Sequence, residues 1–309
     1  MKTITFSKAI ALLALFLALA ACEKTELTSD ISPALSQTSF ADSLHNQLIT
    51  IPVGAQRSVN AYLTKPQGDS LDLVLVLHGG TRDYAKSVEA TLGQVDKEDG
   101  GKQFLDAGYA ILALQYTEFA GPSDTMGVTK GIMEMQDVIS TVDYVQSGEL
   151  GLNGFDVQKF YAFGHSRGGA NALLAGVGRE LDAVISAEGP LNWIQINDSI
   201  ESGFLTPTDR ERVHYDSTTA EWGDPDVDPT LWIRYSASER LPEFKSPFMV
   251  IQGEQDPAAF VELATEMERR YDLCGSCNEE ASFIIHPAGH VDWAYPAILD
   301  SIQGFLQAH

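Results

Sequence analysis

Apolar residues follow two alternating patterns along most of this chain: short continuous runs and longer stretches with helical spacing. Residues 71–77 are almost all apolar and branched, as expected of a strand buried on both faces. Residues 128–146 instead carry apolar side chains three and four positions apart, which predicts an amphipathic helix. The same reasoning predicts strands at 48–53, 58–65, 109–116, 160–163, 181–187, 247–252 and 281–286, and helices at 102–107, 170–177, 260–273 and 294–307.

Strands that alternate with helices favour an α/β fold: a mostly parallel central sheet with helices on both faces. We predict one domain over residues 45–309, with the first two strands pairing antiparallel. Residues 190–246 interrupt the alternation and are rich in aromatic side chains (Trp193, Tyr215, Trp222, Trp232 and Tyr235). We interpret this segment as a lid or cap excursion over the cleft; a purely structural surface subdomain is the alternative.

The N-terminus has the pattern of an export signal. Lys2 and Lys8 precede an apolar run, residues 9–21, that is too short to span a bilayer comfortably. The run ends in Leu19-Ala20-Ala21-Cys22, which resembles the lipobox of bacterial lipoproteins. We therefore expect residues 1–21 to be a signal peptide and Cys22 to carry a lipid, with residues 22–44 as a flexible tether. An ordinary signal peptide is the alternative. With a lipid on Cys22, the protein would be extracytoplasmic and anchored by this N-terminal lipid at the periplasmic face or the cell surface.

Charge narrows the range of partners. The chain has 43 acidic and 20 basic residues, a formal net charge of −23. Such a surface repels nucleic acid and anionic lipid headgroups, so we expect no nucleic-acid partner.

The two remaining cysteines stand close together, in Cys274-Gly275-Ser276-Cys277. In an exported protein this spacing favours a local disulfide. A zinc site would need two more ligands, and none lies at the usual spacing. A redox pair normally follows a strand and opens a helix, whereas this pair follows a predicted helix.

The segment Gly164-His165-Ser166-Arg167-Gly168 lies between a predicted strand and a predicted helix. A Gly-x-Ser-x-Gly sequence in that context is typical of a nucleophile elbow, in which a tight turn presents the serine hydroxyl. Glycines on both sides allow strand and helix to approach closely. A buried structural serine in a glycine-rich turn is the alternative, because a serine hydroxyl needs a base and an acid to become a nucleophile.

Two later strands end in suitable partners. Asp256 follows the apolar strand 247–252, and His290 follows the strand 281–286 on a small-residue turn. The order Ser166, Asp256, His290 is the one expected of this arrangement. Glu188, at the end of another strand, is the rival acid, and His286 lies inside its strand as a packed residue.

The strand 71–77 ends in His78-Gly79-Gly80-Thr81. A glycine turn there predicts half of an oxyanion hole, with donors from Gly80 or Thr81 and from the N–H of Arg167. The alternative is a plain turn with His78 packed beneath it.

On residues 75–80, 161–169, 247–257 and 284–290, the chain resembles the α/β-hydrolase superfamily. It is most similar to the prolyl-oligopeptidase-type and dienelactone-hydrolase groups, through the doubled glycine after Ser166 and the run before residue 247. The resemblance implies a serine hydrolase that needs no cofactor and no metal, acting on a small ester or a short peptide. The chain has no room for the β-propeller that usually precedes the hydrolase domain of the peptidases, which leaves hydrolysis of a small ester or a short peptide open. A prolyl-oligopeptidase-like peptidase and a non-catalytic binding lipoprotein are the alternatives.

Overall fold

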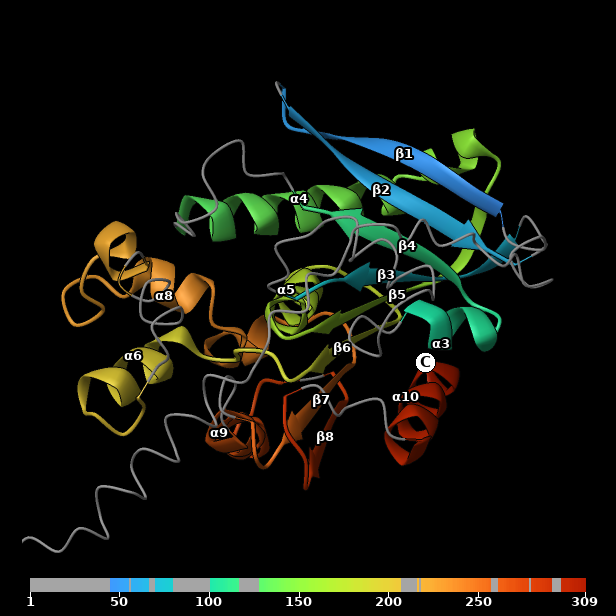
Figure 1. Ribbon diagram of the computed structural model, residues 1–309. Helices are drawn as coiled ribbons and strands as arrows, with labels where there is room; N and C mark the ends of the chain where they lie inside the picture. Colours follow the sequence, from blue (N-terminus) through green and yellow to red (C-terminus); the bar gives the residue numbers. More distant parts are fainter. Residues whose placement is uncertain are drawn as a thin grey trace, which may run out of the picture. The chain divides into compact units, whose positions relative to one another are not determined.

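An eight-stranded sheet forms the centre of the protein, in the order β1-β2-β4-β3-β5-β6-β7-β8 (Figure 1). Its strands are β1 (His45–Val53), β2 (Arg57–Lys65), β3 (Ser70–Leu77), β4 (Ala110–Gln115), β5 (Asp156–His165), β6 (Ala183–Ala187), β7 (Phe248–Gly253) and β8 (Ala281–His286). β1 and β2 pair antiparallel, as do β2 and β4, and the other pairs are parallel. The predicted mostly parallel sheet is confirmed.

The computed structural model describes residues 45–55, 57–66, 70–79, 101–116, 128–206, 216, 218–256, 261–277, 279–290 and 296–309. All of them belong to one compact unit, Ser43–His309. The expected signal peptide (1–21) and tether (22–44) lie outside the described residues. Within the described ranges, no helix combines the length and the apolar character needed to cross a membrane.

Helices cover both faces of the sheet. Side chains of β3 alternate between two apolar clusters: Leu73, Leu75 and Leu77 belong to one, and Val74 and Val76 to the other. The first cluster includes side chains from α4 (Val128–Gln146), α5 (Arg167–Gly176) and α9 (Val261–Asp272). The second includes side chains from α3 (Gly101–Asp106) and α10 (Pro296–Ala308), which lie near each other in Figure 1. Burial on both faces explains why β3 reads as a continuous apolar run.

The direction of chain winding reverses beside β3. β4 lies on one side of β3 and β5 on the other, so the connections after these strands diverge. Leu77 of β3 is in register with Gly164 of β5, which brings the segments that follow both strands together. Such a switch point at the carboxyl ends of strands is where open α/β sheets bind ligands.

The excursion 190–246 includes the short helices α6 (Trp193–Glu201) and α8 (Thr230–Arg234), which lie beside each other (Figure 1). Trp222 stacks on Tyr235 with ring centroids 5.0 Å apart and meets Trp232 edge-on at 5.2 Å. Trp232 is fully buried. The aromatic residues of the predicted excursion therefore pack together at its centre. Tyr215 lies outside the described residues. The role of the excursion as a lid stays a prediction.

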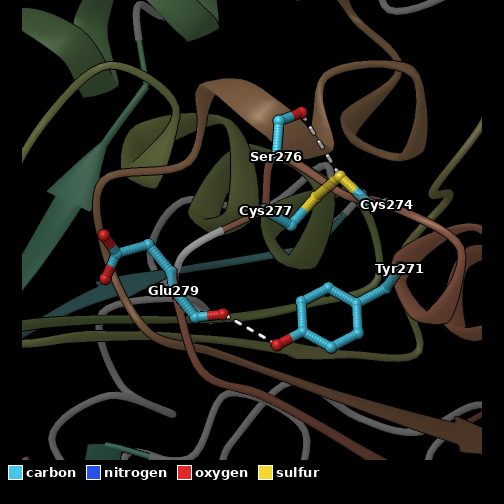
Figure 2. Close-up of a disulfide and its surroundings, with 5 residues drawn as sticks. All are labelled: Tyr271, Cys274, Ser276, Cys277 and Glu279. Carbon is cyan, nitrogen blue, oxygen red and sulfur yellow. Dashed lines mark hydrogen bonds between the residues drawn. A yellow bond between two sulfur atoms is a disulfide. The ribbon is translucent and has the colours of Figure 1, made fainter.

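A disulfide joins Cys274 and Cys277 in the loop between α9 and β8, as Figure 2 shows. Beside it, the Tyr271 hydroxyl donates a hydrogen bond to the Glu279 carbonyl, 2.9 Å away. The loop precedes β8 and therefore lies at the amino ends of the parallel strands. Ser166 follows β5, at the carboxyl ends, so the disulfide and the serine lie at opposite ends of the sheet.

Candidate active site

Ser166 occupies a strained turn between β5 and α5. Its φ is 55°, in the left-handed region that residues with a side chain rarely adopt. Its N–H donates to the Ala187 carbonyl at 2.8 Å, and its own carbonyl accepts the N–H of Gly169 at 2.8 Å. These bonds hold the turn from both sides. Helix α5 begins at Arg167, three residues before the predicted start at 170. Its first turn includes Gly168 and Gly169.

The two glycines that flank Ser166 are sterically required. A Cβ on Gly164 would lie 2.0 Å from the Gly168 carbonyl oxygen, and a Cβ on Gly168 would lie 2.0 Å from the Leu77 carbonyl oxygen. Both separations are far below van der Waals contact. The glycines of the motif therefore permit β5, α5 and β3 to pack around the serine, as the sequence predicts.

Ser166, His290 and Asp256 form a continuous hydrogen-bonded chain. His290 Nε2 lies 2.9 Å from Ser166 Oγ, and His290 Nδ1 lies 2.8 Å from Asp256 Oδ2. The Asp256 side chain is fully buried, while 25% of the His290 side chain is exposed. With a neutral imidazole, Nδ1–H donates to the carboxylate and Nε2 accepts the serine proton. This geometry can activate the hydroxyl as a nucleophile.

Backbone contacts join the loops that carry the acid and the base. The N–H of Glu254 donates to the His286 carbonyl at 2.8 Å, and that of Gln255 to the Ala288 carbonyl at 3.0 Å. A Cβ on Gly253 would lie 2.4 Å from the Ala288 carbonyl oxygen, so glycine permits this approach. The relative position of Asp256 and His290 is thus fixed by main-chain bonds as well as by their own contact.

Gln252 is a member of the site that sequence reasoning missed. Its Nε2–H donates to Asp256 Oδ2 at 2.9 Å, and its side chain is buried. The available signal was a polar residue near the end of the otherwise apolar strand Phe248–Gly253. Glu254, two residues before Asp256, is exposed.

The Nδ1 atom of His290 is hydrogen-bonded to Asp256 and not to Glu188, the rival acid. Its carboxylate instead pairs with His165 and His286, 3.1 Å from an Nε2 atom in each case. His286 is buried, as the sequence predicts for a packed residue.

The predicted oxyanion hole is described only in part. Arg167 is the first residue of α5, and its N–H is among those that a helix start leaves without an intrahelical acceptor. Gly80 and Thr81 lie outside the described residues. The Arg167 guanidinium Nε lies 3.2 Å from the buried Glu134 carboxylate of α4, which anchors the side chain.

His78 packs at the end of β3, beside this turn. Its ring lies 4.4 Å from the Tyr116 ring, and its Nδ1–H donates to the Gly79 carbonyl at 2.8 Å. Burial lowers the pKa of His78 from 6.5 to about 4; the Gly79 hydrogen bond opposes this shift, and the charge of Arg167 adds to it. His78 is therefore neutral near pH 7.

One group of possible metal ligands occurs among the described residues: His165, Glu188 and His290 each offer an atom within 4.8 Å of the others. The nitrogens of His290 already face Ser166 and Asp256. A metal bound there would compete with the hydrogen-bonded chain, so we assign no metal role to these residues.

Comparison with known proteins identifies the family. A family model described as BD-FAE matches residues 59–270, well over half of the chain. The chain belongs to the BD-FAE family. No curated protein matches its sequence.

Solved structures with similar folds include esterases and a peptidase. Carboxyl esterase 2 from Tuber melanosporum has 17% identity and a TM-score of 0.64, covering 96% of this chain and 97% of that one. A truncated carbohydrate esterase from gut microbiota has 19% identity and a TM-score of 0.61, covering 86% and 97%. Pyrococcus horikoshii acylaminoacyl peptidase has 14% identity and a TM-score of 0.61, covering 86% of this chain but only 41% of that one. These likenesses confirm the predicted α/β-hydrolase fold of this BD-FAE family member.

Proposed function

We propose that this protein is a serine hydrolase that cleaves a carboxylic ester through an acyl-enzyme. The hydrogen-bonded chain Ser166–His290–Asp256 carries the proposal, because it joins a nucleophile, a base and an acid at the switch point of the sheet. Membership of the BD-FAE family and the esterases among the structural neighbours support the same reaction class.

The reaction follows from the geometry. His290 Nε2 removes the hydroxyl proton as Ser166 Oγ attacks the acyl carbonyl. Asp256 holds the ring in the tautomer with Nδ1–H and stabilises the imidazolium that forms. The N–H of Arg167, with one from Gly80 or Thr81, would stabilise the oxyanion. His290 then donates its proton to the leaving alcohol, and water, activated by the same ring, hydrolyses the acyl-enzyme to free Ser166.

Replacement of Ser166 by Ala tests the proposal. We expect turnover of p-nitrophenyl acetate to fall by about three or more powers of ten while the fold is retained. Ser301→Ala is the matched control, since Ser301 is an exposed serine of α10 whose hydroxyl donates to the Ala297 carbonyl of the same helix. A Ser166→Ala protein that hydrolyses the ester at the parental rate would refute the nucleophile.

A fluorophosphonate probe separates an enzyme from a binding protein. We expect the probe to label the parent protein at Ser166 and to leave Ser166→Ala unlabelled. An unlabelled parent would favour the non-catalytic binding lipoprotein instead. Among enzymes, a panel of p-nitrophenyl esters against aminoacyl-naphthylamides distinguishes an esterase from a prolyl-oligopeptidase-like peptidase. Faster cleavage of the amides would overturn the choice of ester substrates.

We further infer that the protein is lipid-anchored and extracytoplasmic, on the periplasmic face or the cell surface. The basic start, the apolar run 9–21 and the sequence Leu19-Ala20-Ala21-Cys22 support this placement. Replacement of Cys22 by Ser should abolish incorporation of radiolabelled palmitate and release the protein from the membrane fraction. Equal labelling of parent and variant would contradict the lipid anchor.

A further inference from the structure

Glu188 combines two features that are costly unless they serve a purpose. Its side chain is fully buried, at the end of β6. Its φ is 55°, and Ser166 is the only other residue with a side chain that has positive φ among the described parts of the chain. Buried carboxylates and strained backbone both cost stability, and strained residues concentrate at functional sites. Glu188 therefore calls for an explanation beyond packing.

The carboxylate of Glu188 bridges two histidines, one from β5 and one from β8. Its Oε2 lies 3.1 Å from Nε2 of His165, the last residue of β5, and its Oε1 lies 3.1 Å from Nε2 of His286, the last residue of β8. The N–H of Glu188 donates to the Ile251 carbonyl of β7 at 2.7 Å. One residue thus connects the ends of the strands that precede the nucleophile, the acid and the base.

His165 extends this connection to the base itself. Its Nε2 lies 2.7 Å from the main-chain carbonyl oxygen of His290 as well as 3.1 Å from Glu188. A carbonyl oxygen can only accept, so Nε2 of His165 carries the proton and shares it between the two oxygens. The charged acceptor fixes the ring of His165, and that ring holds the backbone of His290.

Glu188 also adds charge near the reacting ring. One of its carboxylate oxygens and one ring nitrogen of His290 lie within 4.8 Å of each other. Asp256, Ser166 and His165 are among the groups that face the His290 ring. A buried anion at this separation favours the imidazolium that forms during catalysis.

We propose that Glu188 is a positioning residue that orients His290 through His165 and stabilises its protonated ring. The inference rests on the proposed serine-hydrolase function, since it assigns a role in the same reaction. Glu188 does not take the place of Asp256, which holds Nδ1, and it touches no reacting atom.

Glu188→Gln tests the role directly. A glutamine carries no charge and has one acceptor oxygen, so it cannot accept from His165 and His286 at once as the carboxylate does. We expect kcat to fall about 10- to 100-fold with little change in KM, because no substrate contact changes. The acidic limb of the kcat/KM profile should move to lower pH, since the imidazolium loses a nearby anion.

Glu239→Gln is the matched control. Glu239 also accepts bonds from two side chains, Asn192 and Arg270, neither of which belongs to the triad or to the Glu188 contacts. We expect this variant to keep the parental kcat and pH profile even where its stability falls. Parental kinetics in Glu188→Gln, or an equal loss in Glu239→Gln, would overturn the inference.

If Glu188→Gln does not fold, two substitutions of His165 test the same positioning role. A glutamine can present a donor near the position of Nε2, whereas leucine has similar bulk and no donor. We expect His165→Gln to keep most of the parental kcat and His165→Leu to lose about as much as Glu188→Gln. Equal activity of the two His165 variants would refute the route through His165.

Ser166→Ala, assayed alongside, separates this inference from the function on which it rests. Ser166-dependent turnover that is unaffected in Glu188→Gln would refute only the positioning role. A parent protein without Ser166-dependent turnover or probe labelling would refute the proposed function and this inference together.

Discussion

Gln252 Nε2 lies 2.9 Å from Asp256 Oδ2, the same carboxylate oxygen that lies 2.8 Å from His290 Nδ1. One oxygen therefore accepts from two side chains, and the amide donor comes from the strand that leads to the aspartate. Both Gln252 and Asp256 are buried. The amide restricts the rotation of the carboxylate and so fixes the direction in which the carboxylate receives the histidine.

Replacement of Gln252 by Leu should reduce catalysis. The variant removes the amide donor while keeping an apolar group of similar size in the strand. We expect kcat for p-nitrophenyl acetate to fall about tenfold with KM nearly unchanged, because the loss lies behind the acid and not at the substrate. Steady-state kinetics measure the effect.

A second glutamine provides the control for this prediction. Gln158 also donates to an aspartate, Asp156, at 2.9 Å, but the pair is exposed at the start of β5. Gln158→Leu should retain the parental kcat within about twofold, as surface changes away from special features usually do. Parental activity in Gln252→Leu would show that Asp256 needs no support from the amide.

The sequence predicts the triad because each member follows its own strand with a recognisable local pattern. Ser166 lies between glycines, and Asp256 and His290 follow apolar runs in the expected order. The contacts of Gln252 and Glu188 were not predictable in this way. The Glu188 contacts join residues of different strands and depend on strand register, whereas the Gln252 contact depends on how the turn after β7 folds back towards the strand.

The close approach at the elbow predicts a strong effect of Gly168→Ala. The new Cβ would lie 2.0 Å from the Leu77 carbonyl oxygen, so either β3 or α5 must move. We expect a loss of at least about 3 kcal/mol in the free energy of unfolding, or failure to fold. Urea denaturation followed by circular dichroism measures it.

Gly304→Ala is the corresponding control in α10. A Cβ there meets no atom within 4 Å, and alanine is the better helix former. The free energy of unfolding should rise by about 0.5–1 kcal/mol. Equal stability of the two variants would contradict the steric account of the motif glycine.

The start of α5 differs from the prediction. Two consecutive glycines after Ser166 predict a turn, because glycine is a weak helix former. The structure places both in the first turn of the helix, where tertiary packing against β3 and β6 needs residues without a Cβ. Close packing therefore outweighs the low helix propensity of these glycines, and a local sequence pattern does not indicate such packing.

His78 predicts a specific acid sensitivity of stability. Its pKa is about 4 in the folded protein, below the ordinary 6.5, so between these values the unfolded chain binds a proton that the folded chain does not. The free energy of unfolding therefore falls as pH drops from 6.5 towards 4, and the fall ends below the folded pKa. We expect a loss of about 2 kcal/mol from this residue, since solvent screens part of the shift.

His78→Phe isolates this contribution. Phenylalanine keeps a ring against Tyr116 but cannot titrate. The dependence of unfolding free energy on pH should be flatter in the variant than in the parent between pH 6.5 and 4, whatever the difference at pH 8. Parallel curves for parent and variant across that interval would show that His78 does not titrate as the structure implies.

The disulfide offers a last test, because it separates stability from catalysis. The bond closes a loop of only four residues, counted from Cys274 to Cys277, at the end of the sheet opposite Ser166. Loop entropy predicts that Cys274→Ser with Cys277→Ser lowers the free energy of unfolding by at most about 2 kcal/mol. The kcat should stay within about twofold of the parent, because the loop between α9 and β8 lies at the amino ends of the parallel strands and Ser166 at their carboxyl ends. Reduction of the parent by dithiothreitol should give the same pair of results. A large loss of kcat at retained fold would instead connect this loop to the site.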